Sequence, residues 1–267
     1  MKKTAAILLT LILALSVFCG CGTKESKTDL EYILDKGTMV IGYTVFAPIA
    51  YEENGELIGF DVDLAKAVCE KLGVKAEFQL IDWNAKEQEL NAKTIDCIWN
   101  GVTMTPERKE AMLFSKPYLL NRQVVVVKGE NAASYKTLAD LNGKYVAAEG
   151  GSAGAEALEG ADEVSEYTPV KTATQVLALT EVLSGTSDAA IIDSVMAGYY
   201  INTEGSSFTT LKIADGIAFE AEEYGIAFRK EDAKTAEAVN AAIDEFKKDG
   251  TLLEIAEKYG LADGLVK

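Results

Sequence analysis

The sequence contains no histidine among its 267 residues. This absence excludes a Ser-His-Asp triad, a Cys-His nucleophile pair and a zinc site built on imidazole ligands. It also removes the side chain that most often serves as a general base near neutral pH. Carboxylate chemistry is the main acid–base option that remains.

Basic residues are also scarce. The chain has 26 Lys and Arg against 42 Asp and Glu, which gives a formal charge of −16 at pH 7. This balance argues against nucleic acid as a partner and against adhesion to anionic lipid through a basic patch, because both need clustered positive charge. Hydrophobic residues at 48% and charged residues at 25% are typical of a globular chain.

The apolar run near the N-terminus is too short to span a membrane. Residues 5–17 are thirteen uncharged, mostly apolar residues, whereas a membrane-spanning helix needs about 20. Lys2 and Lys3 precede the run. The pattern therefore predicts an export signal over residues 1–20.

Cysteine is rare, and one of the four marks the end of this signal. Cys21 follows the small residue Gly20 and fits a bacterial lipobox, whereas bulky Phe18 disfavours cleavage before Cys19. We expect a lipid on Cys21 as the first residue of the mature chain, followed by a tether over residues 21–29. The alternative is a plain secretory signal cut nearby, which leaves a free cysteine.

Two further cysteines, Cys69 and Cys97, lie in a helix-like and a strand-like segment, and neither has a metal-site spacing. An exported protein can form a disulfide, and two buried thiols used as small apolar residues are at least as compatible with the pattern. Both possibilities stay open at this point.

Strand-like and helix-like segments alternate along the mature chain, which predicts an α/β fold with mainly parallel sheets. Four consecutive valines within residues 123–128 are typical of a strand buried on both faces. The other predicted strands are 39–43, 76–81, 96–99, 144–148 and 189–192; the predicted helices are 61–72, 85–92, 152–158, 174–183, 195–201, 233–247 and 252–259.

Arg108 stands out as a candidate anion-binding residue. Thr105 suits a helix N-cap and Pro106 a first helical position, so Arg108 lies in the first turn, where the helix dipole disfavours a cation. A guanidinium placed there is explained by an anion that the helix amides also attract. The alternative is a solvated surface arginine paired with Glu107 or Glu110.

Asp193 is the matching candidate of opposite charge. It ends the apolar run at residues 189–192 and precedes a helix, so it lies at the carboxyl end of a strand, where open α/β sheets bind ligands. A carboxylate there can accept hydrogen bonds from a ligand ammonium. The alternative is an N-cap for the following helix.

Two weaker signals accompany this pair. Gly150 and Gly151 link a strand to a helix, where the amides of Ser152 and Ala153 are free to receive a carboxylate, although a simple tight turn also explains the glycines. Three aromatic residues near strand ends are placed to wall a pocket or to fill the core: Tyr43, Phe46 and Trp83.

The motifs together resemble those of the family-3 solute-binding proteins that supply amino acids to ABC importers. The resemblance covers residues 36–259, and its signatures are residues 51–65, 95–108, 114–118, 138–144, 187–193 and 224–227, in matching order and spacing. It implies a two-lobed α/β fold of the periplasmic-binding-protein type II, with two crossover strands near 119–122 and 219–224 and the ligand between the lobes. Lobe 1 is then 30–121 plus 222–267, and lobe 2 is 122–221.

The same resemblance implies a set of binding residues. Arg108 is expected to hold the α-carboxylate of an amino acid with the help of Thr103, and Asp193 and the Gly101 carbonyl are expected to take the α-ammonium. Ser152 and Ala153 complete the carboxylate site from lobe 2, and Tyr43, Phe46 and Trp83 surround the side chain. Many relatives that select basic or amide side chains carry an acid where Tyr43 stands, so we expect a polar or neutral amino acid instead.

The expected mechanism is capture by closure of the two lobes, followed by delivery to the membrane subunits of an ABC importer. The resemblance implies a monomer without enzymatic activity, cofactor or metal. It also implies a place on the extracellular face of the cell membrane, held by lipid, or in the periplasm if the source has two membranes. Two alternatives remain: an amino-acid sensor for a signalling partner, and a dehydratase-like enzyme on the same scaffold.

Overall fold

The computed structural model describes residues 27–217 and 219–267. The predicted signal over residues 1–20, Cys21 and most of the predicted tether therefore lie outside the described residues. Within them, no helix combines the length and the apolar character needed to cross a bilayer. Cys69 and Cys97 are both buried and unpaired, so the structure shows two free thiols and not a disulfide.

The described strands form one ten-stranded sheet, in the order β4-β1-β5-β12-β7-β10-β8-β9, with β6 beside β12 and β11 beside β7. A separate hairpin is formed by β2 (Tyr51–Glu53) and β3 (Glu56–Ile58). The sheet strands are β1 (Thr38–Tyr43), β4 (Lys75–Leu80), β5 (Cys97–Thr103), β6 (Leu113–Phe114), β7 (Leu119–Lys128), β8 (Tyr145–Glu149), β9 (Thr168–Thr172), β10 (Ala189–Asp193), β11 (Leu211–Ile213) and β12 (Ala221–Phe228).

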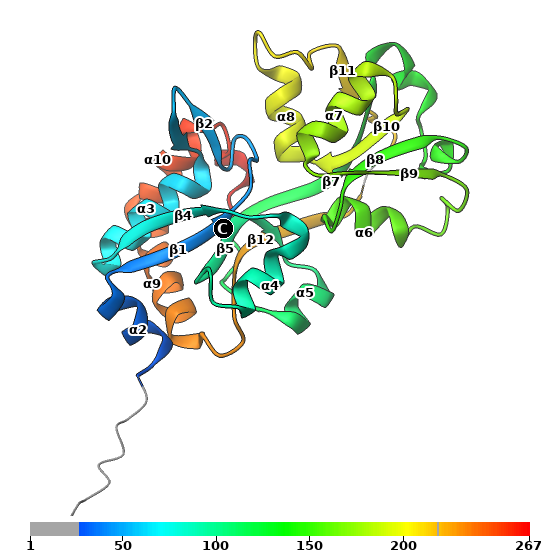
Figure 1. The fold of residues 1–267 in the computed structure, drawn as a ribbon. Coiled ribbons are helices and arrows are strands. Elements are labelled where there is room, and N and C mark those ends of the chain that lie inside the picture. Colours follow the sequence, from blue (N-terminus) through cyan, green and yellow to red (C-terminus); the bar gives the residue numbers. More distant parts are fainter. Residues whose placement is uncertain (1–26, 218) are drawn as a thin grey trace, which may run out of the picture.

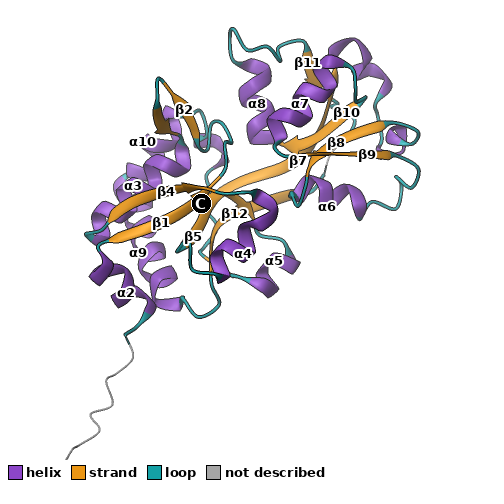
Figure 2. Ribbon diagram, in the orientation of Figure 1, coloured by secondary structure: helices purple, strands orange, loops and turns teal. Residues whose placement is uncertain are grey.

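The helices pack around this sheet in two lobes, which β7 and β12 connect (Figures 1 and 2). In one lobe α3 packs on β4 and β5; in the other, α6 and α7 both pack on β8 and β10. The helices are α2 (Asp29–Lys36), α3 (Phe60–Leu72), α4 (Lys86–Asn91), α5 (Pro106–Ala111), α6 (Ala153–Glu159), α7 (Gln175–Ser184), α8 (Ser194–Asn202), α9 (Ala233–Asp249) and α10 (Thr251–Lys258). The expected two-lobed α/β architecture with two crossover strands is confirmed.

The sequence pattern predicted mainly parallel strands, and this prediction is wrong. The two ends of the sheet are parallel, with β1 between β4 and β5, and β8 between β9 and β10. The centre is antiparallel, because β12 pairs with both β5 and β7, and β7 pairs with β10. The centre takes this form because the two crossover strands, β7 and β12, run in opposite directions between the lobes.

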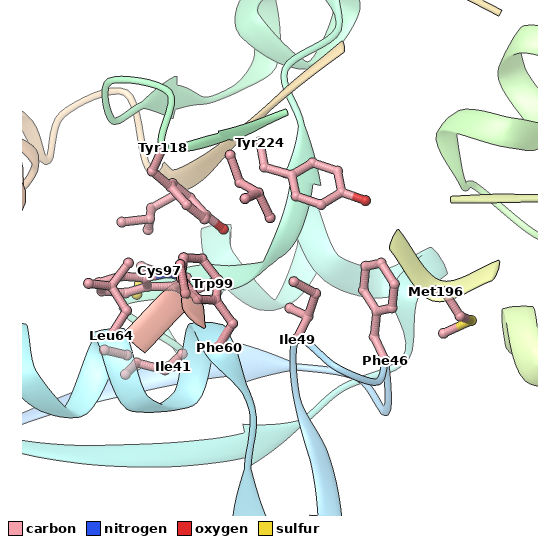
Figure 3. Close-up of a cluster of buried hydrophobic side chains, with 14 of the residues drawn as sticks. Ile41, Phe46, Ile49, Phe60, Leu64, Cys97, Trp99, Tyr118, Met196 and Tyr224 are labelled. Carbon is pink, nitrogen blue, oxygen red and sulfur yellow. The ribbon is translucent and has the colours of Figure 1, made fainter. Parts of the chain in front are cut away.

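The apolar core continues from one lobe to the other. The four valines of β7 are all buried, as the sequence predicted for this strand. Aromatic and aliphatic side chains from β1, β5, α3 and β12 surround the point where the crossover strands leave the first lobe (Figure 3). Phe46 and Met196 extend this cluster across the gap between the lobes (Figure 3).

Gly59, the N-cap of α3, is placed where no other residue fits. Its φ is 137°, and a Cβ there would lie 2.2 Å from the Ile49 carbonyl oxygen. We expect Gly59→Ala to lower the free energy of unfolding by about 2–4 kcal/mol, through backbone strain and a collision with the backbone of residues 49–50. Urea unfolding measures this change.

The matched control is Gly198→Ala, which lies in α8 with nothing within 4 Å of its added Cβ. Alanine in a helix interior should raise the stability there by about 0.5–1 kcal/mol. A Gly59→Ala protein as stable as the wild type would show that the backbone adapts freely at the start of α3.

Candidate functional site

A cavity lies between the two lobes and is lined by residues of both. Four of the strands that approach it, β1, β5, β8 and β10, end at its wall, as expected for a ligand site in an α/β fold. Its lining consists of Thr44, Val45, Phe46, Trp83, Asn100, Gly101, Thr103 and Arg108 from one lobe, and Glu149, Ser152, Ala153, Gln175, Asp193 and Met196 from the other.

The structure brings eight of the nine predicted ligand-binding residues to this cavity and leaves Tyr43 outside its lining. Tyr43 packs edge-on against Phe78, with ring centroids 6.1 Å apart, in a small cluster with Ala50 and Val62. It is followed by Thr44, which does line the cavity. Successive side chains of an extended chain point to opposite sides, which explains the exchange of Tyr43 for Thr44.

Arg108 is buried, with 4% of its surface exposed, and it contacts both lobes. The Thr105 hydroxyl caps α5 by accepting from the Arg108 amide at 3.2 Å. Nη1 donates to the Thr103 carbonyl (3.2 Å), and Nη2 donates to the Gly151 carbonyl (3.1 Å) and to Glu156 Oε1 (3.0 Å) in the other lobe. Nε is buried and has no partner among the described residues, which leaves one donor of the guanidinium unused.

Asp193 is held by neutral donors alone. Its carboxylate accepts from Gln123 Nε2 (2.9 Å), from Tyr224 Oη (2.7 Å) and from the side-chain amides of Asn121 and Gln175. Among the described residues, no lysine or arginine nitrogen lies within 4.0 Å of it. A buried carboxylate with hydrogen bonds but no cation is a suitable place for a cationic ligand group.

The crossover strands supply most of the groups that hold the Asp193 carboxylate in place. Asn121 and Gln123 of β7 donate to Asp193 and also to Glu222 of β12. The Thr103 hydroxyl also donates to Glu222, at 3.0 Å. Burial, together with the nearby charge of Asp193, raises the pKa of Glu222. The site and the connection between the lobes therefore share one hydrogen-bond network.

Gly101 is fixed by a carboxyl group behind the cavity. Asp61, at the start of α3, accepts from the Gly101 amide (2.7 Å) and from Tyr118 Oη (2.8 Å). Gly101 has a φ of 60°, and a Cβ there would lie 2.8 Å from the Phe46 ring, so this position requires glycine. Burial raises the pKa of Asp61 to about 7.

Glu149 and Gln175 are cavity residues that the sequence analysis missed. Glu149 ends β8 as Asp193 ends β10, so the rule that found Asp193 applies to it too. Only 5% of Glu149 is exposed, and burial together with the charge of Asp193 raises the pKa of its carboxyl to about 8. Thr44, Val45, Asn100 and Met196 were missed as well, and nothing in the sequence separates them from ordinary loop or core residues.

Lys86 provides a second link between the lobes. Its ammonium lies 4.9 Å from the centroid of the Trp83 ring and donates to the Trp83 carbonyl (3.3 Å) and the Gly151 carbonyl (3.2 Å). Burial lowers the pKa of Lys86 to about 8, and the neighbouring Arg108 adds to this effect. Two cations of one lobe, Arg108 and Lys86, thus share one carbonyl acceptor in the other.

The cavity is equipped to bind a small dipolar molecule. A guanidinium with a free donor and a carboxylate without a cation enter it from opposite lobes, and aromatic side chains line the space between them. The hydroxyl of Ser152 caps α6 by accepting from the Ala155 amide, at 3.1 Å. Within the described residues, no cluster of three or more acidic or cysteine side chains is arranged to hold a metal ion.

Comparison with known proteins gives a consistent set of similarities. A family model described as bacterial extracellular solute-binding proteins, family 3, matches residues 39–262. The probable amino-acid-binding protein YxeM of Bacillus subtilis is 37% identical over 262 residues, which cover 97% of this chain and 95% of YxeM.

Two solved structures extend the similarity to the fold. A substrate-binding protein of an ABC uptake transporter from Streptococcus pneumoniae, with bound histidine, is 33% identical with a TM-score of 0.80, covering 90% of this chain and 98% of that one. The ancestral amino acid-binding protein AncCDT-1, a precursor of cyclohexadienyl dehydratase, is 32% identical with a TM-score of 0.79, covering 87% and 99%.

The raised pKa of Glu149 predicts a pH dependence of stability. The folded protein binds this proton more tightly than the unfolded chain, so the free energy of unfolding should fall as the pH rises from the ordinary glutamate range toward 8. We expect Glu149→Gln to reduce the loss between pH 5.5 and 7.5 by about 1–2 kcal/mol. Urea unfolding of the ligand-free protein across this range measures it.

Glu159→Gln, on the exposed end of α6, is the control and should follow the wild-type pH profile. The pKa values of Glu222 and Asp61 are also raised, so these groups add to the loss of stability with rising pH. Some of this loss should therefore remain in Glu149→Gln. Identical slopes for Glu149→Gln and wild type would show that the Glu149 carboxyl titrates in its ordinary range.

Proposed function

The chain belongs to family 3 of the bacterial extracellular solute-binding proteins, and we propose that it binds a free amino acid and delivers it to an ABC importer. One observation carries the proposal: Arg108 and Asp193, of opposite charge and from opposite lobes, face the same buried cavity. An α-amino acid carries the two complementary charges on one small molecule.

The α-carboxylate is assigned to Arg108. Its free Nε provides a donor in addition to the contacts that already position the guanidinium. Thr103, on the same side of the cavity, contributes its amide, and its hydroxyl contributes by turning from Glu222 to the ligand. The amides of Ser152 and Ala153 at the start of α6 complete the group from the other lobe. The Ser152 amide donates to the Glu149 carbonyl at 3.2 Å, so the Ala153 amide has the larger part in this role.

The α-ammonium is assigned to Asp193 and the Gly101 carbonyl. The ammonium supplies the positive charge that the surroundings of Asp193 lack, and Asp61 fixes the Gly101 peptide. Phe46 and Trp83 surround the ligand side chain, while Tyr43 packs against Phe78 outside the cavity lining.

Capture proceeds by closure of lobe 1 (residues 30–121 and 222–267) onto lobe 2 (residues 122–221). Each lobe holds part of the ligand, so the ligand favours the closed state by its differential affinity for that state. The cross-lobe hydrogen bonds of Arg108 and Lys86 to Gly151 support the closed arrangement. The closed monomer then presents a surface that the membrane subunits of the importer recognise.

An enzymatic role has one supporting observation, the similarity to AncCDT-1. That protein is itself described as an amino acid-binding protein, and the described cavity has no histidine to act as a general base. Binding is therefore the function that the geometry favours. Turnover of a prephenate-like substrate would support the enzyme instead.

A thermal-shift screen of the twenty common amino acids and cystine tests the proposal. A ligand at about 100 times its Kd stabilises the folded state by about 2.7 kcal/mol, which raises the Tm by roughly 5–10 °C. We expect such a shift for at least one amino acid. Arg108→Ala and Asp193→Ala should each lose at least about 30-fold in affinity by calorimetry, because each leaves a ligand charge buried without a partner.

Lys109→Ala is the control, since Lys109 is exposed on the same short helix as Arg108. It should bind the ligand with wild-type affinity. If neither Arg108→Ala nor Asp193→Ala weakened binding while both kept the wild-type circular dichroism spectrum, the assignment of the two charged groups would be wrong.

Attachment to the outer face of the cell membrane completes the proposal, with a lipid on Cys21. In bacteria fed a labelled fatty acid, Cys21→Ala should lose the label and leave the membrane fraction. Cys19→Ala is the control and should keep both. If Cys21→Ala kept the label, the lipid would have to be attached to another residue. If the wild-type protein carried no label, a plain secretory signal would be favoured.

A further inference from the structure

The charged side chains that line the cavity exceed what an ordinary amino acid requires. They are one cation, Arg108, and two carboxyl groups, Asp193 and Glu149. If the proposed function is correct, the α-carboxylate of the ligand uses Arg108 and its α-ammonium uses Asp193. Glu149 then faces the ligand with no partner in the amino-acid backbone.

Glu149 lies close to Asp193 but belongs to a different part of the cavity wall. It is the last residue of β8 and Asp193 is the last of β10, and these two strands are parallel neighbours. Neighbouring strands are about 5 Å apart, so one small molecule can reach both carboxyl groups. A ligand whose ammonium is on Asp193 therefore extends its side chain past Glu149.

The protein does not neutralise Glu149 directly. Among the described residues no lysine or arginine nitrogen lies within 4.0 Å of its carboxylate, and Lys86, whose charge lowers the Glu149 pKa, donates to the Trp83 and Gly151 carbonyls. The side-chain amide of Gln175 binds Asp193 and also forms a hydrogen bond with Glu149, which lowers the pKa of Glu149 but supplies no positive charge. A buried carboxyl with so little compensation is costly unless a bound group stabilises it.

We propose that Glu149 makes this site selective for amino acids whose side chain carries a second cationic nitrogen. The proposal rests on the proposed amino-acid function and names its substrate class. The rest of the lining suits such a side chain, because Val45 and Met196 can contact an alkyl stem while Phe46 and Trp83 offer aromatic faces to a cation. The opposite lobe thus supplies the acid that the sequence lacks at Tyr43, and a cationic ligand replaces the polar or neutral one expected from the sequence.

The charges around Glu149 also predict how such binding depends on pH. Asp193 and Asp82 raise the pKa of its carboxyl and Lys86 lowers it, while burial is the largest effect and brings it to about 8. Lys171 of β9 packs beside the next residue, Gly150. Since a cationic ligand requires the ionised carboxylate, its binding should release a proton and become tighter from pH 6 to pH 8.

Calorimetry with matched ligand pairs tests the proposal on protein freed of bound ligand by unfolding and refolding. The pairs are lysine and norleucine, arginine and citrulline, and ornithine and norvaline. Wild-type protein should bind at least one cationic member at least tenfold more tightly than its neutral partner. Glu149→Gln should lose most of this preference and its proton release, Glu149→Asp should keep part of it, and Glu159→Gln should keep it all.

The outcomes separate this inference from the proposed function. A wild-type protein that binds no amino acid in the full screen would overturn the function. One that binds the neutral member of each pair as tightly as the cationic one would overturn the role of Glu149 and leave the function intact. A cationic preference that survives in folded Glu149→Gln would likewise assign selectivity to another residue. The wild-type ratio decides the ligand class even if Glu149→Gln fails to fold.

Discussion

The side-chain amides of Asn121 and Gln123 each donate to two buried carboxyl groups, Asp193 and Glu222. Burial and the charge of Asp193 disfavour the ionisation of Glu222, and hydrogen bonds from the two amides and the Thr103 hydroxyl oppose this effect. Because β7, β10 and β12 all contribute to the network, the position of Asp193 in the cavity depends on how the two connecting strands lie. The geometry of the ligand site and that of the link between the lobes are therefore set together.

A second buried acid has a comparable role in the other lobe. Asp61 belongs to α3, is not one of the residues that line the cavity, and fixes the Gly101 peptide by a 2.7 Å hydrogen bond. The sequence segment around Asp61 is among those that most clearly resemble the family. Its position behind the site indicates that this segment preserves the geometry of a binding residue rather than a ligand contact.

Much of the fold could be predicted, because capping residues and apolar runs act locally. Thr105 and Pro106 locate the start of α5, and the valines identify β7. β12 was predicted only through the family resemblance, since Glu222 and Glu223 interrupt its apolar pattern and its pairing with β5 and β7 decides its structure. The edge strand β9 contains Pro169, which disguises it as a loop.

The candidate site could be predicted in outline for the same reason. Strand ends indicated Asp193, and the same rule applies to Glu149, which the adjoining glycines concealed as part of a turn. The direction of a side chain at the end of a strand depends on where the extended backbone stops. An error of one residue in the predicted strand end is therefore enough to place Tyr43 at the cavity wall, where the structure has Thr44. The roles of these residues in binding remain predictions.

The carbonyl of Gly151 accepts hydrogen bonds from both Arg108 and Lys86, which come from the opposite lobe. Any separation of the lobes must break both contacts in the same movement and bring two cationic groups into water together. The opposite wall carries Asp193 and Glu149, so an open cleft would have a positive side facing a negative side. Such a field orients an approaching dipolar molecule across the cleft, with its anionic end toward Arg108 and its cationic end toward Asp193, before any contact with the cavity is made.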